Sequence, residues 1–146
     1  MIDMVDNQDY TLSLNNQGKI VQVEDGIKLL RIIYQDGNVV RKEYNGWGID
    51  YTYDTKNNPY LNDAFANKIR LDELVRLARW GLRDFAKSGV VSNKNNLIAG
   101  SPEPGTGHFW KPIQSEYEYK QAGYPVYEYT TVNRDDMWIT FFAYDE

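Results

Sequence analysis

The sequence contains no cysteine and a single histidine, His108. Without cysteine the chain has no disulfide, no zinc–thiolate site and no cysteine nucleophile. Any imidazole base or imidazole metal ligand has to be His108, which follows a segment rich in glycine and proline. These absences exclude several classes of enzyme and metalloprotein, and they leave the redox environment of the chain undecided.

Basic residues and long apolar runs are also scarce. The formal net charge is −5 at pH 7, with 16 Lys and Arg residues against 21 Asp and Glu residues. Nucleic-acid binding requires a basic surface, so we expect no nucleic-acid partner. We expect no transmembrane segment, and residues 1–9 carry acids where a signal peptide carries positive charge. The protein is therefore expected to be cytoplasmic, or its sequence begins after a removed leader.

Aromatic residues, in contrast, are abundant and recur at the ends of predicted strands. They make up 14% of the chain, which includes 12 Tyr. Leu14, Tyr34 and Tyr53 each end an alternating segment before a polar turn, and they lie 20 and 19 positions apart. Such a period accommodates two short strands and two turns, so the sequence predicts consecutive antiparallel hairpins. A fourth copy of the pattern begins at Tyr119.

The predicted elements form a single domain of the α+β class, an antiparallel β-meander of about eight strands with one helix. Residues 10–54 are expected to form a first meander, and residues 114–145 a second group of strands. Residues 69–87 carry apolar side chains at helical offsets, which predicts an amphipathic helix packed on one face of the sheet. Residues 100–112 are rich in Pro and Gly, which predicts an irregular loop. Residues 137–144 are apolar on both faces and predict an interior strand.

Several of these segments resemble the tyrosine-aspartate repeat (YD repeat) of Rhs-type proteins, in which an aromatic ends a strand and an acid opens the turn. The matching elements are Tyr53-Asp54, Tyr144-Asp145 and the turn Gly37-Asn38-Val39. Three longer stretches are similar to small repeat-bearing lipoproteins of Bacteroides-type gut bacteria: Tyr51–Tyr60, Asn95–Leu97 and Glu116–Pro125. The resemblance implies a secreted β protein of the bacterial cell envelope, with a lipid anchor on a residue absent from this sequence. It implies no catalytic residue, because the shared motif consists of turn and strand positions.

The segment around His108 matches no catalytic or cofactor-binding motif. Gly100-Ser101-Pro102 differs from the nucleophile elbow of a hydrolase. Gly100–Thr106 has the glycine spacing of a phosphate-binding loop, but it has Thr where that loop requires Lys. The acidic and amide-rich turns lack the alternating oxygen ligands of a calcium loop. We therefore expect no cofactor, no metal site and no assigned catalytic residue.

Strand carboxylates leave one enzymatic alternative open, a glycan-acting hydrolase. Such an enzyme needs two acids at a set distance, one of them with a raised pKa. Four acids lie on strands that can neighbour one another: Glu116, Glu118, Glu128 and Asp50. Their alternation with other strand residues indicates that they face water.

Aromatic residues in loops give the main functional hypothesis. Trp47 lies between glycines, and His108, Phe109 and Trp110 lie in the predicted irregular loop. Aromatic faces in exposed loops bind sugars and partner proteins, although most rings in a tyrosine-rich sheet pack in the core. We expect a non-catalytic binding or structural protein of the envelope that contacts glycan or another envelope protein through these four residues. A cytoplasmic protein that uses the basic face of the helix at residues 69–87 is a further alternative.

Overall fold

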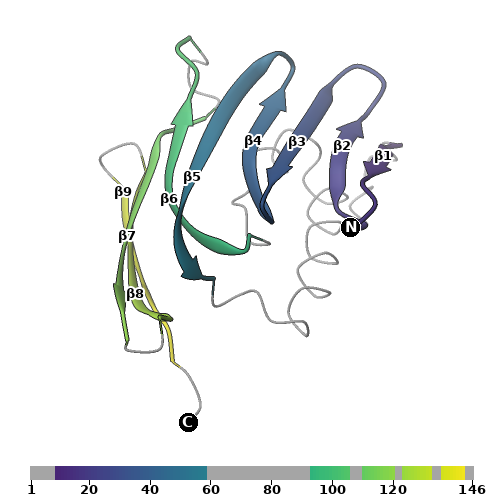
Figure 1. Ribbon diagram of the computed structural model, residues 1–146. Coiled ribbons are helices and arrows are strands. Elements are labelled where there is room, and N and C mark those ends of the chain that lie inside the picture. Colours follow the sequence, from purple (N-terminus) through teal and green to yellow (C-terminus); the bar gives the residue numbers. More distant parts are fainter. Residues whose placement is uncertain (1–8, 59–92, 106–109, 121–122, 133–135, 144–146) are drawn as a thin grey trace, which may run out of the picture.

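The computed structural model describes residues 9–58, 93–105, 110–120, 123–132 and 136–143. They form one sheet of nine antiparallel strands, in which each strand pairs with the next one in sequence (Figure 1). The strands are β1 (Thr11–Leu14), β2 (Ile20–Glu24), β3 (Leu29–Gln35), β4 (Asn38–Tyr44), β5 (Trp47–Asn57), β6 (Asn95–Pro102), β7 (Ile113–Tyr119), β8 (Pro125–Val132) and β9 (Asp136–Phe141). The strands β1 and β9 therefore lie at the two edges of the sheet.

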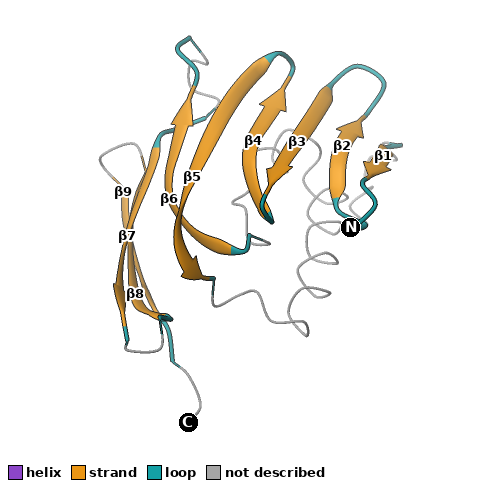
Figure 2. Cartoon of the chain, in the orientation of Figure 1, coloured by secondary structure: helices purple, strands orange, loops and turns teal. Residues whose placement is uncertain are grey.

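The predicted α+β class is wrong, because the described part of the chain is all-β. Figure 2 shows strands and loops but no helix among the described residues. Residues 69–87, for which a helix was predicted, lie outside the described residues. The antiparallel meander is confirmed, with nine strands where about eight were predicted. In the described segments, side chains alternate with a period of two between turn residues. This pattern favours strands and not helices.

Strand β6 extends into the segment that was predicted to be an irregular loop. It continues to Pro102, and Gly100 pairs with Tyr51 on one side and Ile113 on the other. A Cβ at Gly100 would lie 3.3 Å from side-chain atoms of both Ile49 and Tyr51. This glycine therefore allows a close approach between neighbouring strands. From the sequence alone, such a glycine cannot be distinguished from one that forms a turn.

Two hairpin turns have both central residues at positive φ. The values are 51° and 87° for Asp36 and Gly37, and 51° and 85° for Asn45 and Gly46. This is the conformation of a type I′ turn, whose twist matches that of the flanking strands. The polar turn predicted after Tyr34 is therefore confirmed at Asp36-Gly37. The two turns set the register of β4 against both of its neighbours.

The hydrophobic core lies on one face of the sheet. Val23 pairs with Leu30, and Leu30 with Tyr44, so buried side chains form a row across β2, β3 and β4. The buried cluster consists of Val23, Leu30, Ile32, Val39, Tyr44, Ile49, Tyr51 and Trp110. The side chain of Lys42 lies on the same face, between Ile32 and Ile49, and is almost completely buried.

Asparagine side chains join the β3–β4 turn to the segment that enters β6. The side-chain amide of Asn38 donates to Asn95 Oδ1 at 2.9 Å, and the backbone N–H of Asn95 donates to Asn38 Oδ1 at 2.9 Å. The buried Asn93 Oδ1 accepts the N–H of Val39 at 2.7 Å, and the carbonyl of Asn93 accepts from Asn58 Nδ2 at 2.9 Å. These amides hold the segment that enters β6 against the β3–β4 turn and the end of β5. We call Asn38, Asn58, Asn93 and Asn95 the asparagine latch.

The carboxylate of Asp54 makes a second connection, between β5, β6 and β7. Its Oδ1 accepts the backbone N–H of Asn96 at 3.1 Å, and its Oδ2 accepts from Asn96 Nδ2 at 3.1 Å. The hydroxyl of Tyr119 also donates to Oδ2 of Asp54. Burial, followed by the hydrogen bond to Asp54, raises the pKa of Tyr119 above its ordinary value, so this hydroxyl stays a neutral donor.

Strand β9 lies at an edge of the sheet, although residues 137–144 were predicted to form an interior strand. In the described part of the chain, β9 pairs with β8 alone. The prediction of an interior strand is therefore wrong for a single copy of the chain. Exposed apolar side chains nevertheless lie on both faces of β9.

We expect Asn93→Ala to lower the free energy of unfolding by about 1–3 kcal/mol, because the buried N–H of Val39 loses its acceptor. Asn57→Ala is the matched control, since Asn57 is exposed and close in sequence to the latch residue Asn58. Urea unfolding of the two variants measures the difference. Equal stabilities would show that the asparagine latch does not stabilise the packing of the segment that enters β6.

Candidate functional site

The described part of the chain has a polar depression where the β1–β2 and β3–β4 turns meet the segment before β6. Its volume is about 500 Å³. Its lining residues are Asn15, Asn16, Gln17, Lys19, Tyr34, Gln35, Asp36, Gly37 and Lys94. The two turns lie at the same end of the sheet because they are separated by two antiparallel strands (Figure 1). We call this feature the turn-end depression.

The first wall of the depression is the β1–β2 turn, which Asn15 organises. Its Oδ1 accepts the backbone N–H groups of Gln17 at 3.0 Å and Lys19 at 2.9 Å. Gly18 has a φ of 72° and donates its N–H to the carbonyl of Asn15 at 3.0 Å. Because the Asn15 side chain is occupied in the turn, the side chains of Asn16 and Gln17 are the ones that can face a ligand.

Lys19 connects the first turn to the second. Its Nζ lies 4.9 Å from the centre of the Tyr34 ring and 3.5 Å from the carbonyl oxygen of Gly37. A cation over an aromatic face is attracted by the negative charge density of the ring. Lys19 therefore fixes the spacing between the two turns.

The β3–β4 turn forms the second wall of the depression. Lys94, which packs directly against this turn, forms the third. Its backbone N–H donates to the carbonyl of Gly37 at 3.3 Å, and a Cβ at Gly37 would lie 3.1 Å from Lys94 Cβ. Gly37 is thus required both for its positive φ and for this close approach. The adjacent asparagine latch holds Asn93 and Asn95 in place, so the backbone of the depression is fixed on three sides.

The lining of the depression offers unused hydrogen-bonding groups. Within the described residues, the side-chain amides of Asn16, Gln17 and Gln35 form no hydrogen bond with the protein. Each amide has two donors and one acceptor, and the exposed Lys94 ammonium and Asp36 carboxylate lie beside them. This site is suited to a ligand with many hydroxyl or other polar groups.

Local sequence patterns predict these turns, but they do not predict the depression that the turns form. The one sequence feature that indicates this site is the repeat. A period of about 20 residues, which is two strands and two turns, places the turns that follow Leu14 and Tyr34 at the same end of a meander. The contribution of Lys94 depends on the chain returning after residues 59–92, which no local pattern predicts. The depression therefore could be found only from the tertiary structure.

The aromatic residues predicted to bind a ligand lie in different environments. The Trp47 side chain is 46% exposed at the start of β5, next to Gly105. Trp110 is 6% exposed and belongs to the buried core, so its ring has little surface to offer a ligand. His108 and Phe109 lie outside the described residues. Trp47 is at the opposite end of β4 from the turn-end depression (Figure 1).

The strand carboxylates named for the hydrolase alternative are divided between the two faces of the sheet. Tyr117 pairs with Glu128 across β7 and β8, whereas Glu116 and Glu118 alternate with Tyr117 and so lie on the other face. Oε1 of Glu128 accepts from Tyr117 and from Thr130, each at 2.9 Å. The structure does not bring these three acids into one pocket.

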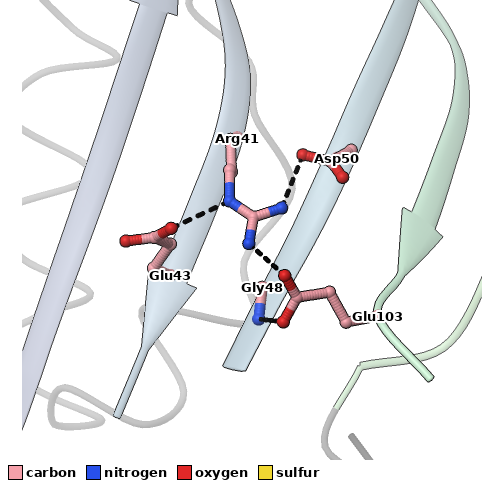
Figure 3. Close-up of polar contacts among 5 residues, drawn as sticks. All are labelled: Arg41, Glu43, Gly48, Asp50 and Glu103. Carbon is pink, nitrogen blue, oxygen red and sulfur yellow. Dashed lines mark hydrogen bonds and ion pairs between the residues drawn. The ribbon is translucent and has the colours of Figure 1, made fainter. Parts of the chain in front are cut away.

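The remaining acid, Asp50, belongs to an ion cluster centred on Arg41 (Figure 3). The Arg41 guanidinium donates to Glu43 at 2.9 Å, to Asp50 at 2.8 Å and to Glu103. The second oxygen of Glu103 accepts the backbone N–H of Gly48 at 2.9 Å. Three carboxylates around one cation form a structural tie between β4, β5 and the residue after β6. The ion pairs with Arg41 explain why these three carboxylates lie close together, so their proximity does not indicate a catalytic role.

The pKa shifts in this cluster follow from the same contacts. The hydrogen bond to Asp50, followed by those to Glu103 and Glu43, raises the pKa of Arg41 above its ordinary value. The hydrogen bond from Arg41, followed by that from the N–H of Gly48, lowers the pKa of Glu103. Both shifts favour the charged forms of Arg41 and Glu103.

Gly48 makes room for the guanidinium of Arg41. Glu43 pairs with Gly48 across β4 and β5, and a Cβ on Gly48 would overlap the guanidinium group. Because Gly48 has no positive φ, space is the reason for a glycine at this position.

Comparison with protein-family models, with curated protein sequences and with solved structures gives no match. The resemblance to repeat-bearing lipoproteins therefore stays a prediction. Among the described residues, no helix is long and apolar enough to cross a membrane. In the same part of the chain, no group of His, Asp and Glu side chains is placed to hold a metal ion.

We expect Gly48→Ala to displace the Arg41 guanidinium and to destabilise the fold by roughly 0.5–3 kcal/mol, the range of interaction energies between residues in contact. In an Arg41→Met background the same substitution should have a much smaller effect, because no guanidinium remains to be displaced. Thermal or urea unfolding of both single variants and the double variant measures this coupling. Additive effects would show that Gly48 is required for another reason.

We expect the stability difference between the wild type and Arg41→Met to decrease as the pH falls. The pKa of Glu103 is lowered in the folded state, so its contribution is present above the ordinary value of 4.5 and is lost as protonation proceeds below it. Urea unfolding at neutral pH and at roughly pH 3 measures the difference at the two extremes. Asp25 also has a lowered pKa, but it is unchanged between the two proteins and cancels in the comparison. A difference that is constant with pH would contradict an ionic origin.

Proposed function

We propose that this chain is a non-catalytic glycan-binding protein and that the turn-end depression is its binding site. The observation that carries this proposal is the set of three side-chain amides, those of Asn16, Gln17 and Gln35, which line the depression without a hydrogen bond to the described protein. They are held on turns whose backbones are fixed by other contacts. Such groups are placed in advance for a ligand, so binding requires little reordering of the protein backbone.

A glycan fits the chemistry of this lining better than an apolar ligand. Sugar hydroxyls both donate and accept hydrogen bonds, and a carboxamide side chain does the same. Pockets for apolar small molecules are lined mainly by hydrophobic and aromatic groups, whereas the single aromatic lining residue, Tyr34, lies under the Lys19 ammonium. The volume of about 500 Å³ is sufficient for a short oligosaccharide segment.

The arrangement of acids favours binding over hydrolysis. Among the residues lining the depression, Asp36 is the one carboxylate, and glycoside hydrolysis uses two carboxyl groups in most enzymes. The strand acids elsewhere are divided between faces or paired with Arg41. The resemblance to repeat-bearing lipoproteins supports a position in the bacterial cell envelope, where such a protein would contact surface glycans.

A glycan array probed with the wild type and with Asn16→Ala/Gln35→Ala tests this proposal. Both side chains are exposed and form no hydrogen bond within the described protein, so the double variant should fold normally. We expect it to lose at least tenfold in affinity for any glycan that the wild type binds, because two hydrogen bonds to the ligand are removed. Titration calorimetry on the strongest array hit gives the dissociation constants.

Two controls locate the site. Lys28→Ala changes an exposed lysine at the β2–β3 turn, at the opposite end of the sheet, and should leave binding unchanged. Trp47→Ala tests the aromatic site that the sequence suggested. Loss of binding in Trp47→Ala with full binding in Asn16→Ala/Gln35→Ala would move the site to Trp47, and absence of any glycan binding by the wild type would contradict the proposed function.

A further inference from the structure

Strand β9 carries an unusual concentration of exposed apolar side chains. In the described part of the chain, ten large hydrophobic residues are exposed, and four of them lie on this strand of six residues. They are Met137, Trp138, Ile139 and Phe141, with Met137 68% and Phe141 71% exposed. Residues 137–143 contain no charged side chain and no proline. Edge strands of monomeric proteins are usually protected by lysine, proline or a bulge, and this segment has none of these.

The backbone of β9 also has hydrogen-bonding groups that point away from the sheet. The N–H of Phe142 donates to the carbonyl of Val126 at 3.1 Å, and the β8–β9 register continues without a shift. In an antiparallel pair, hydrogen-bonded residues alternate with residues whose N–H and C=O face the other way. The even-numbered positions therefore bond to β8, and Met137, Ile139 and Phe141 direct their N–H and C=O groups outward.

We propose that β9 pairs with β9 of a second copy of this chain, in antiparallel orientation about a two-fold axis at Ile139. In this register Ile139 faces its own counterpart, and Met137 of each copy faces Phe141 of the other. All outward-directed backbone groups of these residues are then satisfied, because the facing positions are the ones that point outward in both copies. The two sheets become one continuous sheet.

The side chains of β9 are complementary to themselves in this register. Met137, Ile139 and Phe141 of both copies form one apolar row on the same face, next to Tyr127, whose ring contacts Phe141 edge-on at 5.2 Å between centroids. On the other face, Trp138 of each copy lies opposite Thr140 of its partner. Since residues 137–143 are uncharged, the pairing places no like charges opposite one another.

A second copy also explains why β9 has the sequence pattern of an interior strand. A strand that is apolar on both faces is expected where neighbours lie on both sides. The other edge of the sheet is different, since β1 has four residues and includes the polar Thr11 and Ser13. A contact between β9 and β1 of another copy would be open-ended and would form chains of molecules. A two-fold contact between β9 strands closes at the dimer.

The absence of cysteine allows a direct test of the register. In the proposed dimer, opposed residues at Ile139 have Cα atoms about 5.5 Å apart, a distance that a disulfide can span. We therefore expect Ile139→Cys to form a covalent dimer on mild oxidation. Met137→Cys is the matched control, because the two copies of position 137 are separated by four residues along the strands, about 13 Å. Efficient cross-linking of Met137→Cys without Ile139→Cys would overturn the register.

Sedimentation velocity over a range of protein concentrations tests the dimer itself. We expect a dimer for the wild type and a monomer for Ile139→Pro, because proline removes an outward N–H while the bonds to β8 are kept. Leu14→Lys adds a charge on β1, at the other edge of the sheet, and should leave the dimer intact. Circular dichroism checks that each variant is folded.

Three results would overturn the proposal. A wild type that is monomeric at all concentrations would exclude self-association. A dimer that persists in Ile139→Pro would place the interface away from β9. Species larger than a dimer that disappear in Leu14→Lys would indicate the open-ended contact between β9 and β1.

Discussion

The hydrogen bonds of the asparagine latch are the constraint on which the rest of this structure depends. Strands β1 to β5 form by local hairpin pairing, but β6 has to return to β5 after residues 59–92, and bringing distant segments together carries an entropic penalty. The reciprocal bonds between Asn38 and Asn95, together with the bond from Val39 to the buried Asn93, fix the returning segment on the β3–β4 turn. A carboxamide suits this task because one side chain supplies both donors and an acceptor.

The same latch produces the turn-end depression. By holding the residues on either side of it, the latch places Lys94 against Gly37 and completes a concave surface of which the two hairpin turns alone form only part. The amides inside the latch are satisfied by protein partners, whereas the amides of Asn16, Gln17 and Gln35 face the depression and are not. Carboxamide side chains thus serve two purposes in this region. Buried amides connect the strands, and exposed amides are available to a ligand.

The two ends and the two faces of the sheet have separate chemical characters. The end opposite the depression carries Trp47, and the Arg41 cluster ties β4 and β5 to Glu103 on the face opposite the core. The β9 edge is apolar, and residues 137–143 carry no charged side chain. In the proposed dimer the two-fold axis reverses the strand direction of the second copy. The two depressions would therefore lie at opposite ends of one continuous sheet, where each could bind a ligand independently of the dimer contact.

Much of the topology could be predicted from local residues. The turn at Asp36-Gly37 requires positive φ, and the alternation in β1 and β5 together with the spacing of Leu14, Tyr34 and Tyr53 indicates antiparallel hairpins; the sheet confirms the meander. The predicted fold class was wrong because the helical periodicity of residues 69–87, outside the described residues, was used to assign it. The loop prediction also failed at Gly100, because a glycine that allows close packing and a glycine that allows a turn are identical in sequence.

By itself, the sequence determined the strand period, the turn conformations and the absence of cysteine chemistry, because each of these follows from a residue and its near neighbours. Only the tertiary structure decided that Trp110 is buried while Trp47 is exposed, that Asp50 pairs with Arg41, and that Lys94 packs against the β3–β4 turn. It also decided that β9 is an edge strand. These four outcomes depend on contacts between residues distant in sequence. Such contacts are set by packing and by the register between strands, which local patterns do not encode.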